Sequence, residues 1–276
     1  MSELKILTLS WQGKDKLQEL YPSLKASLND INFKWFIKDN GSTDGSIDLI
    51  NSWEDPNVIG IKYPNNTDTF AYGCNFLFKE ASCNDDDFVL LLNNDVKFID
   101  TNSIRKMMNL FKNPDIGLVG AKTLFKDSNL IQHAGVVFHM RYGMPFHFGA
   151  NQKDCDIFSK NREFQAVTGA VWLTKAEYFR NICTTNKSGQ FGLTEDYIWA
   201  FEDISACLAI KYNMNKKVIC CGETKILHDE SSSLKKNPMN KLFHNKNTNT
   251  FLNLWKGRYI LDADDYNKSP KYNLYK

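Results

Sequence analysis

Several carboxylates and one histidine stand where reactive side chains are commonly placed. Asp39 and Asp95 each follow an expected strand, Glu202-Asp203 opens an expected helix, and His228 follows a late strand. Carboxylate and imidazole groups, together with the oxygens of a diphosphate, suit a divalent cation such as Mn²⁺ or Mg²⁺. Plain structural readings compete with this: His228 as a capped surface histidine, and Glu202-Asp203 as charges favoured by the helix dipole.

The stretch Val89-Leu90-Leu91-Leu92-Asn93-Asn94-Asp95 shows how such residues could be positioned. Its apolar part is too short for a typical helix, which predicts a strand buried on both faces. Ligands of open α/β sheets bind outside the carboxyl ends of the strands, so the polar end of this run is a candidate binding position. An ordinary Asn/Asp turn is the alternative.

The first 123 residues alternate between strand-like and helix-like patterns. Apolar residues at helical spacing, such as Leu17, Leu20 and Leu24, indicate helices, whereas short apolar runs indicate strands. The alternation predicts βαβ units and a mostly parallel central sheet flanked by helices, an α/β fold. The expected strands cover residues 4–10, 33–38, 58–63, 88–92 and 117–122, and the expected helices cover 14–28, 46–53, 69–81 and 103–111.

After residue 122 this alternation fades. Residues 125–164 are rich in Phe, His, Gly and Asn without a clear period, which predicts irregular structure with short strands. No repeat, low-complexity tract or Pro-rich linker divides the chain, which favours one compact domain with a divergent second half. Further along we expect strands at 166–173, 217–221 and 225–227 and helices at 175–180 and 203–212.

Composition and missing motifs exclude several classes of protein. The 276 residues carry a net charge of +2, far from the basic balance of a dedicated nucleic-acid binder. Seven scattered cysteines without a CxxC pair predict neither a disulfide framework nor a zinc site, and favour a reducing, cytoplasmic setting. We expect no signal peptide and no membrane span. The phosphate loops of Rossmann and P-loop proteins and the GxSxG of α/β-hydrolases are missing.

Eight short motifs in order resemble the inverting family 2 glycosyltransferases of GT-A fold, in particular a bacterial branch with rhamnosyltransferase-like enzymes. The motifs are Leu9-Ser10-Trp11, Asp39-Asn40-Gly41-Ser42-Thr43-Asp44, Phe70-Ala71-Tyr72-Gly73-Cys74-Asn75, Leu92-Asn93-Asn94-Asp95, Gln132-His133-Ala134-Gly135, Thr168-Gly169-Ala170, Phe201-Glu202-Asp203 and His228-Asp229-Glu230-Ser231. The resemblance implies a GT-A domain at 1–233, with a nucleotide-sugar-binding half (1–123) and an acceptor-binding, catalytic half (124–233). An extension (234–276) follows.

The resemblance implies that the first half holds a nucleoside-diphosphate sugar. Asp39 would accept a hydrogen bond from the base N–H, with Trp11 against the base. Asn93 replaces the first acid of the family's DxD motif, and its amide can still bind a ribose hydroxyl. The other implied donor-binding residues are Leu9, Asn75, Asn94 and Asp95.

The resemblance also implies a metal and a base. Asp95 and His228 would hold Mn²⁺ or Mg²⁺, although Asn93 leaves Asp95 as the only carboxylate of its motif. Asp203 would deprotonate the acceptor hydroxyl in one inverting displacement. Ser205 stands where the family often has a second acid.

The acceptor is implied to be a glycan, a polysaccharide or a lipid-linked saccharide. Glu202 would orient the acceptor or the base. Trp172 and Trp199 could stack on an acceptor sugar, but a place in the core suits either tryptophan equally well.

Two other functions compete with glycosyl transfer. A sugar-phosphate nucleotidylyltransferase would be expected to have a Gly-rich phosphate loop after the first strand, and Ser10-Trp11-Gln12-Gly13 is not one. A non-catalytic carbohydrate-binding relative would be expected to have lost Asp203 or Asp95, and both are present.

The end of the chain is basic and partly apolar. Residues 211–276 contain 13 Lys and Arg against 6 Asp and Glu, a net charge of +7. A basic segment with interleaved apolar residues can lie on an anionic membrane, which suggests peripheral membrane contact through this tail. The alternative, favoured by the ragged spacing, is a helix packed onto the domain. The apolar residues are Met239, Leu242, Phe243, Phe251, Leu252, Leu254 and Trp255.

Overall fold

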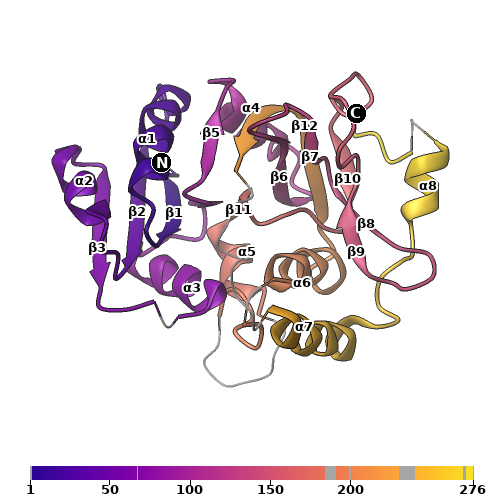
Figure 1. The fold of residues 1–276 in the computed structure, drawn as a ribbon. Coiled ribbons are helices and arrows are strands. Elements are labelled where there is room, and N and C mark those ends of the chain that lie inside the picture. Colours follow the sequence, from indigo (N-terminus) through magenta and orange to yellow (C-terminus); the bar gives the residue numbers. More distant parts are fainter. Residues whose placement is uncertain are drawn as a thin grey trace.

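A computed structural model describes residues 2–66, 68–183, 191–198, 200–229, 240–269 and 272–275, with backbone only for 240–244. The chain order of its elements is drawn in Figure 1. The first half contains β1 (Leu4–Ser10), α1 (Lys14–Ser27), β2 (Phe33–Asn40), α2 (Ser46–Ser52), β3 (Val58–Tyr63), α3 (Phe70–Glu80), β4 (Phe88–Leu92), β5 (Val96–Phe98), α4 (Ser103–Leu110) and β6 (Ile116–Phe125).

The second half has shorter elements and more loops, as its composition predicted. It contains β7 (Ile131–His133), β8 (Val136–Phe138), β9 (Pro145–His147), β10 (Arg162–Phe164), β11 (Val171–Lys175), α5 (Ala176–Asn181), α6 (Glu202–Leu208), a π-helical turn (Ala209–Asn213), β12 (Lys217–His228), α7 (Asn240–Trp255) and α8 (Ala263–Lys268).

One large mixed sheet organises the molecule, which confirms the α/β class. Its strand order is β10-β12-β6-β11-β4-β1-β2-β3, with β5 paired to β12 and β7 paired to β6. The strands β4, β1, β2 and β3 are parallel, as the βα alternation predicted. The strand β11 lies antiparallel between β4 and β6, and so joins the regular first half to the second half.

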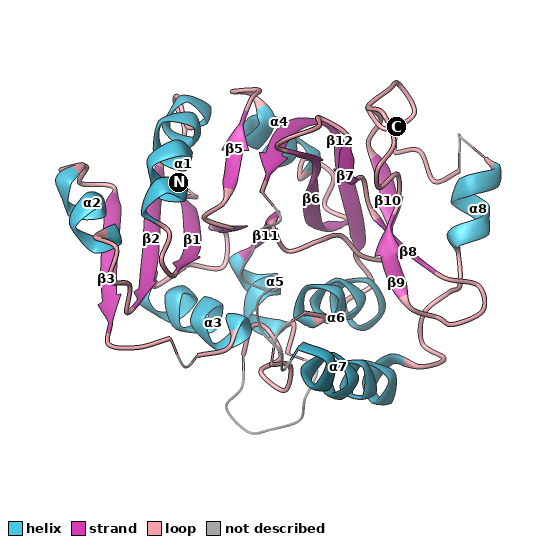
Figure 2. Cartoon of the chain, viewed as in Figure 1, coloured by secondary structure: helices cyan, strands magenta, loops and turns pink. Residues whose placement is uncertain are grey.

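Helices cover both faces of this sheet, and each face has its own apolar core (Figure 2). Alternate residues of β4 point to opposite faces: Leu91 joins the core beneath α3, α5 and α6, whereas Leu90 joins the core beneath α1 and α4. Residues 89–92 are all buried, so the expectation of a strand covered on both faces is confirmed.

Some expected boundaries were wrong in the second half. The expected strand at 166–173 begins only at Val171, because residues 166–170 form a loop beside α6. The expected helix at 203–212 is α6 followed by a π-helical turn. The two expected late strands are one strand, β12, interrupted by a bulge between Cys221 and Ile226.

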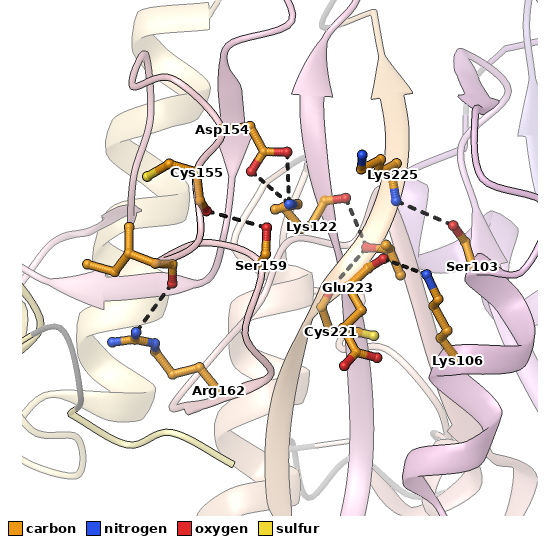
Figure 3. Close-up of polar contacts among 12 residues, drawn as sticks. Ser103, Lys106, Lys122, Asp154, Cys155, Ser159, Arg162, Cys221, Glu223 and Lys225 are labelled. Carbon is orange, nitrogen blue, oxygen red and sulfur yellow. Dashed lines mark hydrogen bonds and ion pairs between the residues drawn. The ribbon is translucent and has the colours of Figure 1, made fainter. Parts of the chain in front are cut away.

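Hydrogen bonds within the bulge and from two residues of α4, Ser103 and Lys106, hold this bulge (Figure 3). The Thr224 hydroxyl donates to the Cys221 carbonyl at 2.8 Å, and Lys106 of α4 donates to the Glu223 carbonyl at 3.1 Å. A side chain at Gly222 would place its Cβ 2.3 Å from the Lys160 carbonyl oxygen, so the close approach requires glycine. Beyond the bulge, β12 continues to His228.

The end of the chain packs onto the same core. Phe251 and Trp255 of α7 are 0% exposed, and Tyr266 of α8 is buried in the same cluster. The packed-helix alternative is therefore correct for these two α7 residues, and they are not available to a membrane. Met239, the side chains of Leu242 and Phe243, and the predicted boundary at 233 lie outside the described residues. Among those that are described, no helix is long and apolar enough to cross a membrane.

Candidate active site

The first part of the site is a carboxylate–imidazole pair. The end of β12 runs antiparallel to β5, with His228 opposite Val96, which brings the imidazole to Asp95 at the start of β5. The His228 Nε2 atom lies 3.2 Å from Asp95 Oδ1 and 3.4 Å from the Asn93 amide nitrogen. The backbone N–H of Asp229 also donates to the Asp95 carbonyl, so the two predicted metal ligands lie on rigidly paired strands.

Gln132 of β7 orients the imidazole. Its Oε1 atom accepts hydrogen bonds from His228 Nδ1 at 2.7 Å and from the Thr123 hydroxyl at 2.9 Å. With Nδ1–H donating to Gln132, Nε2 is the ring nitrogen that faces Asp95. Such an outer contact fixes the tautomer and direction of a metal-binding histidine. Tautomer and amide orientation follow here from the hydrogen-bond network.

Asp95 is ionised in this setting. Burial opposes its charge, but the hydrogen bond and charge of His228 and the nearby Lys16 ammonium lower the Asp95 pKa below its usual value. Lys16 Nζ lies 3.7 Å from Asp95 Oδ2. A pocket of about 210 Å³ opens beside the carboxylate, lined partly by Lys16, Lys126 and Asp229.

The donor set fits a divalent cation that is shared with a ligand. An oxygen and an imidazole nitrogen converge within 3.2 Å, and Mn²⁺ accepts both donor types. The described part of the chain contains no group of three or more His, Cys, Asp or Glu residues that could hold an ion. Oxygens of a diphosphate or of water could fill the remaining coordination positions.

The second part of the site is Asp203 at the start of α6. Its Oδ2 atom accepts a hydrogen bond from the Gly169 N–H at 2.7 Å, and its Oδ1 atom accepts one from the Ile204 N–H at 2.8 Å. Ala200 and Phe201 before it have φ angles of 64° and 71°, left-handed values that are strained for residues other than glycine. The chain therefore holds Asp203 in one orientation, and the two strained residues before it make this backbone conformation unfavourable in free energy.

The electrostatics favour a basic Asp203 carboxylate. Burial raises the pKa of Asp203 above its ordinary value, although the backbone N–H groups of Gly169 and Ile204 and the nearby His147 oppose this rise. Burial, and then the neighbouring Asp203 charge, raise the pKa of Glu202 to about 8. Glu202 is therefore neutral at pH 7, and its Oε2 atom has no hydrogen-bond partner in the described part of the chain.

One loop, Thr168-Gly169-Ala170, joins the two parts. Gly169 binds Asp203, while the Ala170 carbonyl accepts a hydrogen bond from the Asn93 N–H at 2.9 Å. His133, next to Gln132, accepts a hydrogen bond from the Thr168 N–H at 3.3 Å. Burial, with the neighbouring histidines, keeps the pKa of His133 well below its ordinary value, so it is a neutral acceptor. The backbone of Asn93 and the carboxylate of Asp203 are thus tied to a common loop.

On the donor side, two loops are linked to one another. The Gln12 N–H donates to the Ser42 hydroxyl at 2.8 Å, and Trp11 beside it is 49% exposed and available for stacking. Asp39, predicted to bind the base, is instead fully buried, and its two carboxylate oxygens accept hydrogen bonds from the Ser42 hydroxyl and N–H. A base could reach Asp39 only after this turn opens.

Three other predicted donor ligands lie against protein. Asn75 binds the backbone of Leu193 in both directions, at 2.8 and 2.9 Å, and also donates to Glu195. Since its amide is 4% exposed and already bonded, Asn75 anchors the loop at 191–198 in this structure. Leu9 is half-buried against Gly73 of α3, whereas the Asn94 amide donates to Ser10 at 3.0 Å.

The predicted acceptor residues also lie in the core. Trp172 of β11 is 0% exposed and has its ring 6.2 Å from that of Phe179, so it offers no surface for a sugar to stack on. Glu202 is 7% exposed. The core alternative is therefore the correct one for Trp172, because β11 is an inner strand covered by helices. Trp199 lies outside the described residues.

Sequence reasoning missed the contributions of Gln132, His147 and Lys16. Gln132 belonged to a recognised motif, but no spacing rule connects it to His228, which lies 96 residues later. His147 and Lys16 gave no local signal either: one lies in the irregular segment, and the other looks like an ordinary helix lysine.

Solved structures share this fold. A mannosyltransferase of Pyrobaculum calidifontis, in complex with GDP-Man and Mn²⁺, aligns over 96% of this chain and 78% of its own, with a TM-score of 0.59 and 11% identity. S. aureus TarS in complex with UDP-GlcNAc aligns over 91% of this chain and 67% of its own, with a TM-score of 0.60 and 12% identity. At such identities the likeness shows the GT-A fold alone.

Sequence comparisons show the family. The O-antigen biosynthesis protein RfbC of Myxococcus xanthus is 27% identical over 228 residues, which are 79% of this chain and 16% of that protein. An uncharacterized protein of Sinorhizobium fredii is 30% identical over 129 residues, 45% of this chain and 13% of that protein. The chain thus spans less than a fifth of either relative. Residues 6–168 match the profile of glycosyl transferase family 2, and this chain therefore belongs to that family.

Proposed function

We propose that the protein transfers a sugar from a nucleoside-diphosphate sugar to a hydroxyl acceptor with inversion, and that Asp203 is the base. The observation that carries the proposal is the loop at 168–170, which binds the Asp203 carboxylate through Gly169 and the Asn93 backbone through Ala170. An oriented carboxylate with a raised pKa, tied by one short loop to the motif that would bind the donor, is the arrangement that a single in-line displacement needs.

The residues would divide the reaction as follows. Trp11 would stack on the base, Asn93 would bind the ribose, and Asp95 with His228 would hold a divalent cation on the diphosphate. The bound cation would neutralise charge that develops on the leaving group. Asp203, held by two backbone N–H groups, would take the proton of the acceptor hydroxyl with its remaining lone pairs.

The acceptor is proposed to be a growing glycan, a polysaccharide intermediate or a lipid-linked saccharide, handled on the cytoplasmic side. Support comes from the Myxococcus xanthus relative, an O-antigen biosynthesis protein. The rhamnosyltransferase-like branch stays a prediction. A nucleotidylyltransferase is disfavoured, because no described contact supplies a basic phosphate loop at Gln12-Gly13.

A two-step experiment tests the proposal. A panel of nucleotide sugars with Mn²⁺ is first screened for thermal stabilisation, since a ligand at 100 times its Kd adds about 2.7 kcal/mol. The stabilising donor is then incubated with saccharide acceptors, and the anomeric configuration of the product is read by NMR. We expect the inverted anomer. A retained configuration, or nucleotidyl transfer to a sugar phosphate, would overturn the assignment.

A further inference from the structure

Exposed apolar side chains gather on one surface of the second half. Eight large hydrophobic side chains are exposed in the described part of the chain, and five of them lie on two segments. We call these five the hairpin patch: Met140 (44% exposed), Tyr142 (63%) and Phe146 (41%) from the β8–β9 hairpin, and Ile260 (61%) and Leu261 (38%) from the connection between α7 and α8. Scattered single residues would need no explanation, but a cluster does.

The two segments are joined into one surface. The Tyr259 hydroxyl donates to the Gly143 carbonyl at 2.7 Å, and a Cβ on Gly143 would lie 3.6 Å from a Leu261 methyl group. At the base of the hairpin, Asp262 accepts a hydrogen bond from the Phe138 N–H at 2.9 Å. Figure 1 shows the hairpin loop beside the chain that leads from α7 to α8. The patch is therefore built by tertiary contacts.

The chain around the patch is basic. Residues 133–153 and 240–261 contain no Asp or Glu, but they contain Arg141, Lys153, Lys241, Lys246, Lys256 and Arg258. Arg141 and Lys256 are exposed, and the Arg141 guanidinium lies 5.3 Å from the Tyr142 ring centre. The next acids along the chain are Asp154, which pairs with Lys122, and Asp262, which is buried, followed by Asp264, which pairs with Lys268, and Asp265.

We propose that the hairpin patch docks on an anionic membrane surface. Exposed aromatic and aliphatic side chains beside exposed basic residues match the apolar boundary and the negative headgroups of such a membrane. The apolar centre of a protein–protein interface is, by contrast, poor in lysine. This surface differs from the predicted tail stripe, because Phe251 and Trp255 point into the core and Ile260 and Leu261 do not.

The position of β9 gives docking a consequence for the site. Successive residues of a strand point to opposite faces, and Phe146 is exposed while the neighbouring His147 is half-buried near Asp203. A membrane under the patch would thus contact the strand whose other face carries His147 near Asp203. The inference goes beyond the proposed transfer reaction and does not depend on it.

Co-sedimentation with vesicles tests the proposal without any turnover. The full chain is mixed with phosphatidylcholine vesicles, or with the same vesicles containing phosphatidylglycerol, at low and high salt. We expect binding only to the anionic vesicles, weakened by salt. The double variant Tyr142→Ser/Ile260→Ser should lower the partition coefficient at least about tenfold, and Arg141→Ala/Lys256→Ala should lower it about fivefold per residue.

Matched control variants come from other surfaces. Ile99→Ser removes a 51% exposed apolar side chain, and Lys79→Ala/Lys112→Ala removes two exposed charges. Both controls should bind vesicles like the unaltered chain, and all variants should keep its thermal unfolding temperature. Absence of salt-sensitive binding, or equal losses in the controls, would overturn the proposal. A dimer that dissociates in Tyr142→Ser/Ile260→Ser would assign the patch to a second copy instead.

Discussion

Trp255 in α7 donates a hydrogen bond from its indole Nε1 to the hydroxyl of Ser205 in α6, at 2.7 Å. Ser205 follows the proposed base by two residues, at a position where related enzymes often carry a second acid. Both side chains are fully buried. Nearby, the Phe201 ring stacks on Phe251 at 5.1 Å. The C-terminal helix thus supports the turn that presents Asp203, and the serine takes part in that docking.

Trp255→Phe should lower the free energy of unfolding by about 2 kcal/mol, from one lost buried hydrogen bond and a small cavity. Turnover should fall as well, because the support of α6 is loosened. Denaturant unfolding and initial rates measure the two effects. Trp53→Phe is the control, since this half-buried ring stacks on Tyr21 far from α6. If Trp255→Phe and Trp53→Phe lowered turnover equally, the Ser205 contact would have no specific role in supporting α6.

Asp203→Asn should abolish transfer while leaving donor binding nearly intact. The amide keeps the size of the side chain but cannot take a proton at neutral pH. General-base groups typically contribute 10²- to 10⁴-fold, so turnover should drop by about that factor. Asp156→Asn, at an exposed loop position, serves as the control. Turnover above about a tenth of the starting value would exclude Asp203 as the base.

Activity should require a divalent cation, and Asp95→Ala and His228→Ala should each weaken donor binding and turnover. The two side chains approach within 3.2 Å at paired strand ends and supply an oxygen and a nitrogen donor. Donor titrations with and without Mn²⁺, and rates in excess chelator, test this. The exposed Asp86→Ala change should have no effect. Full activity after metal removal would contradict the assignment.

Gln132→Met should weaken Mn²⁺ binding in the presence of nucleoside diphosphate by about 10- to 100-fold, the usual effect of losing an outer contact to a metal-binding histidine. Methionine keeps the side-chain volume but cannot accept the hydrogen bond from His228 Nδ1. Calorimetry measures the affinity, and ¹⁵N NMR reads which ring nitrogen carries the proton. Gln152→Met, at an exposed position, is the control. An Nδ1 atom without a proton in the unaltered protein would contradict this role.

Glu202→Gln should change how stability depends on pH. In the folded chain the Glu202 pKa is raised to about 8, above its ordinary value, so folding favours the protonated form. This contribution to stability is complete below the ordinary pKa and is lost as pH rises through about 8. The difference in unfolding free energy between the variant and the unaltered chain should therefore move in favour of the variant by on the order of 2 kcal/mol between about pH 5 and pH 8. The free energy of unfolding is measured against pH by denaturant unfolding. If the profiles of the two proteins run parallel, folding does not raise the pKa of Glu202.

The sequence alone determined the regular half of the fold and several positions of the site. Apolar periods of 2 and 3.6 residues are local, so every strand and helix up to β6 could be predicted with small boundary errors, except the three-residue strand β5, which was missed. The buried run Val89–Leu92, which ends in Asn93-Asn94-Asp95, predicted which edge of the sheet would bind a ligand. Asp203 and His228 came from motif order, which depends on resemblance and not on geometry.

Only the tertiary structure decided how these positions meet. The antiparallel pairing of β5 with β12 puts His228 beside Asp95, and it depends on a bulge whose close approach needs Gly222. Likewise, the buried amide of Asn75, the core position of Trp172 and the closed turn at Asp39 follow from contacts with distant residues. A short local pattern can specify which face of a strand is apolar. It cannot specify which distant segment covers that face, because this choice is made by the packing of the whole chain.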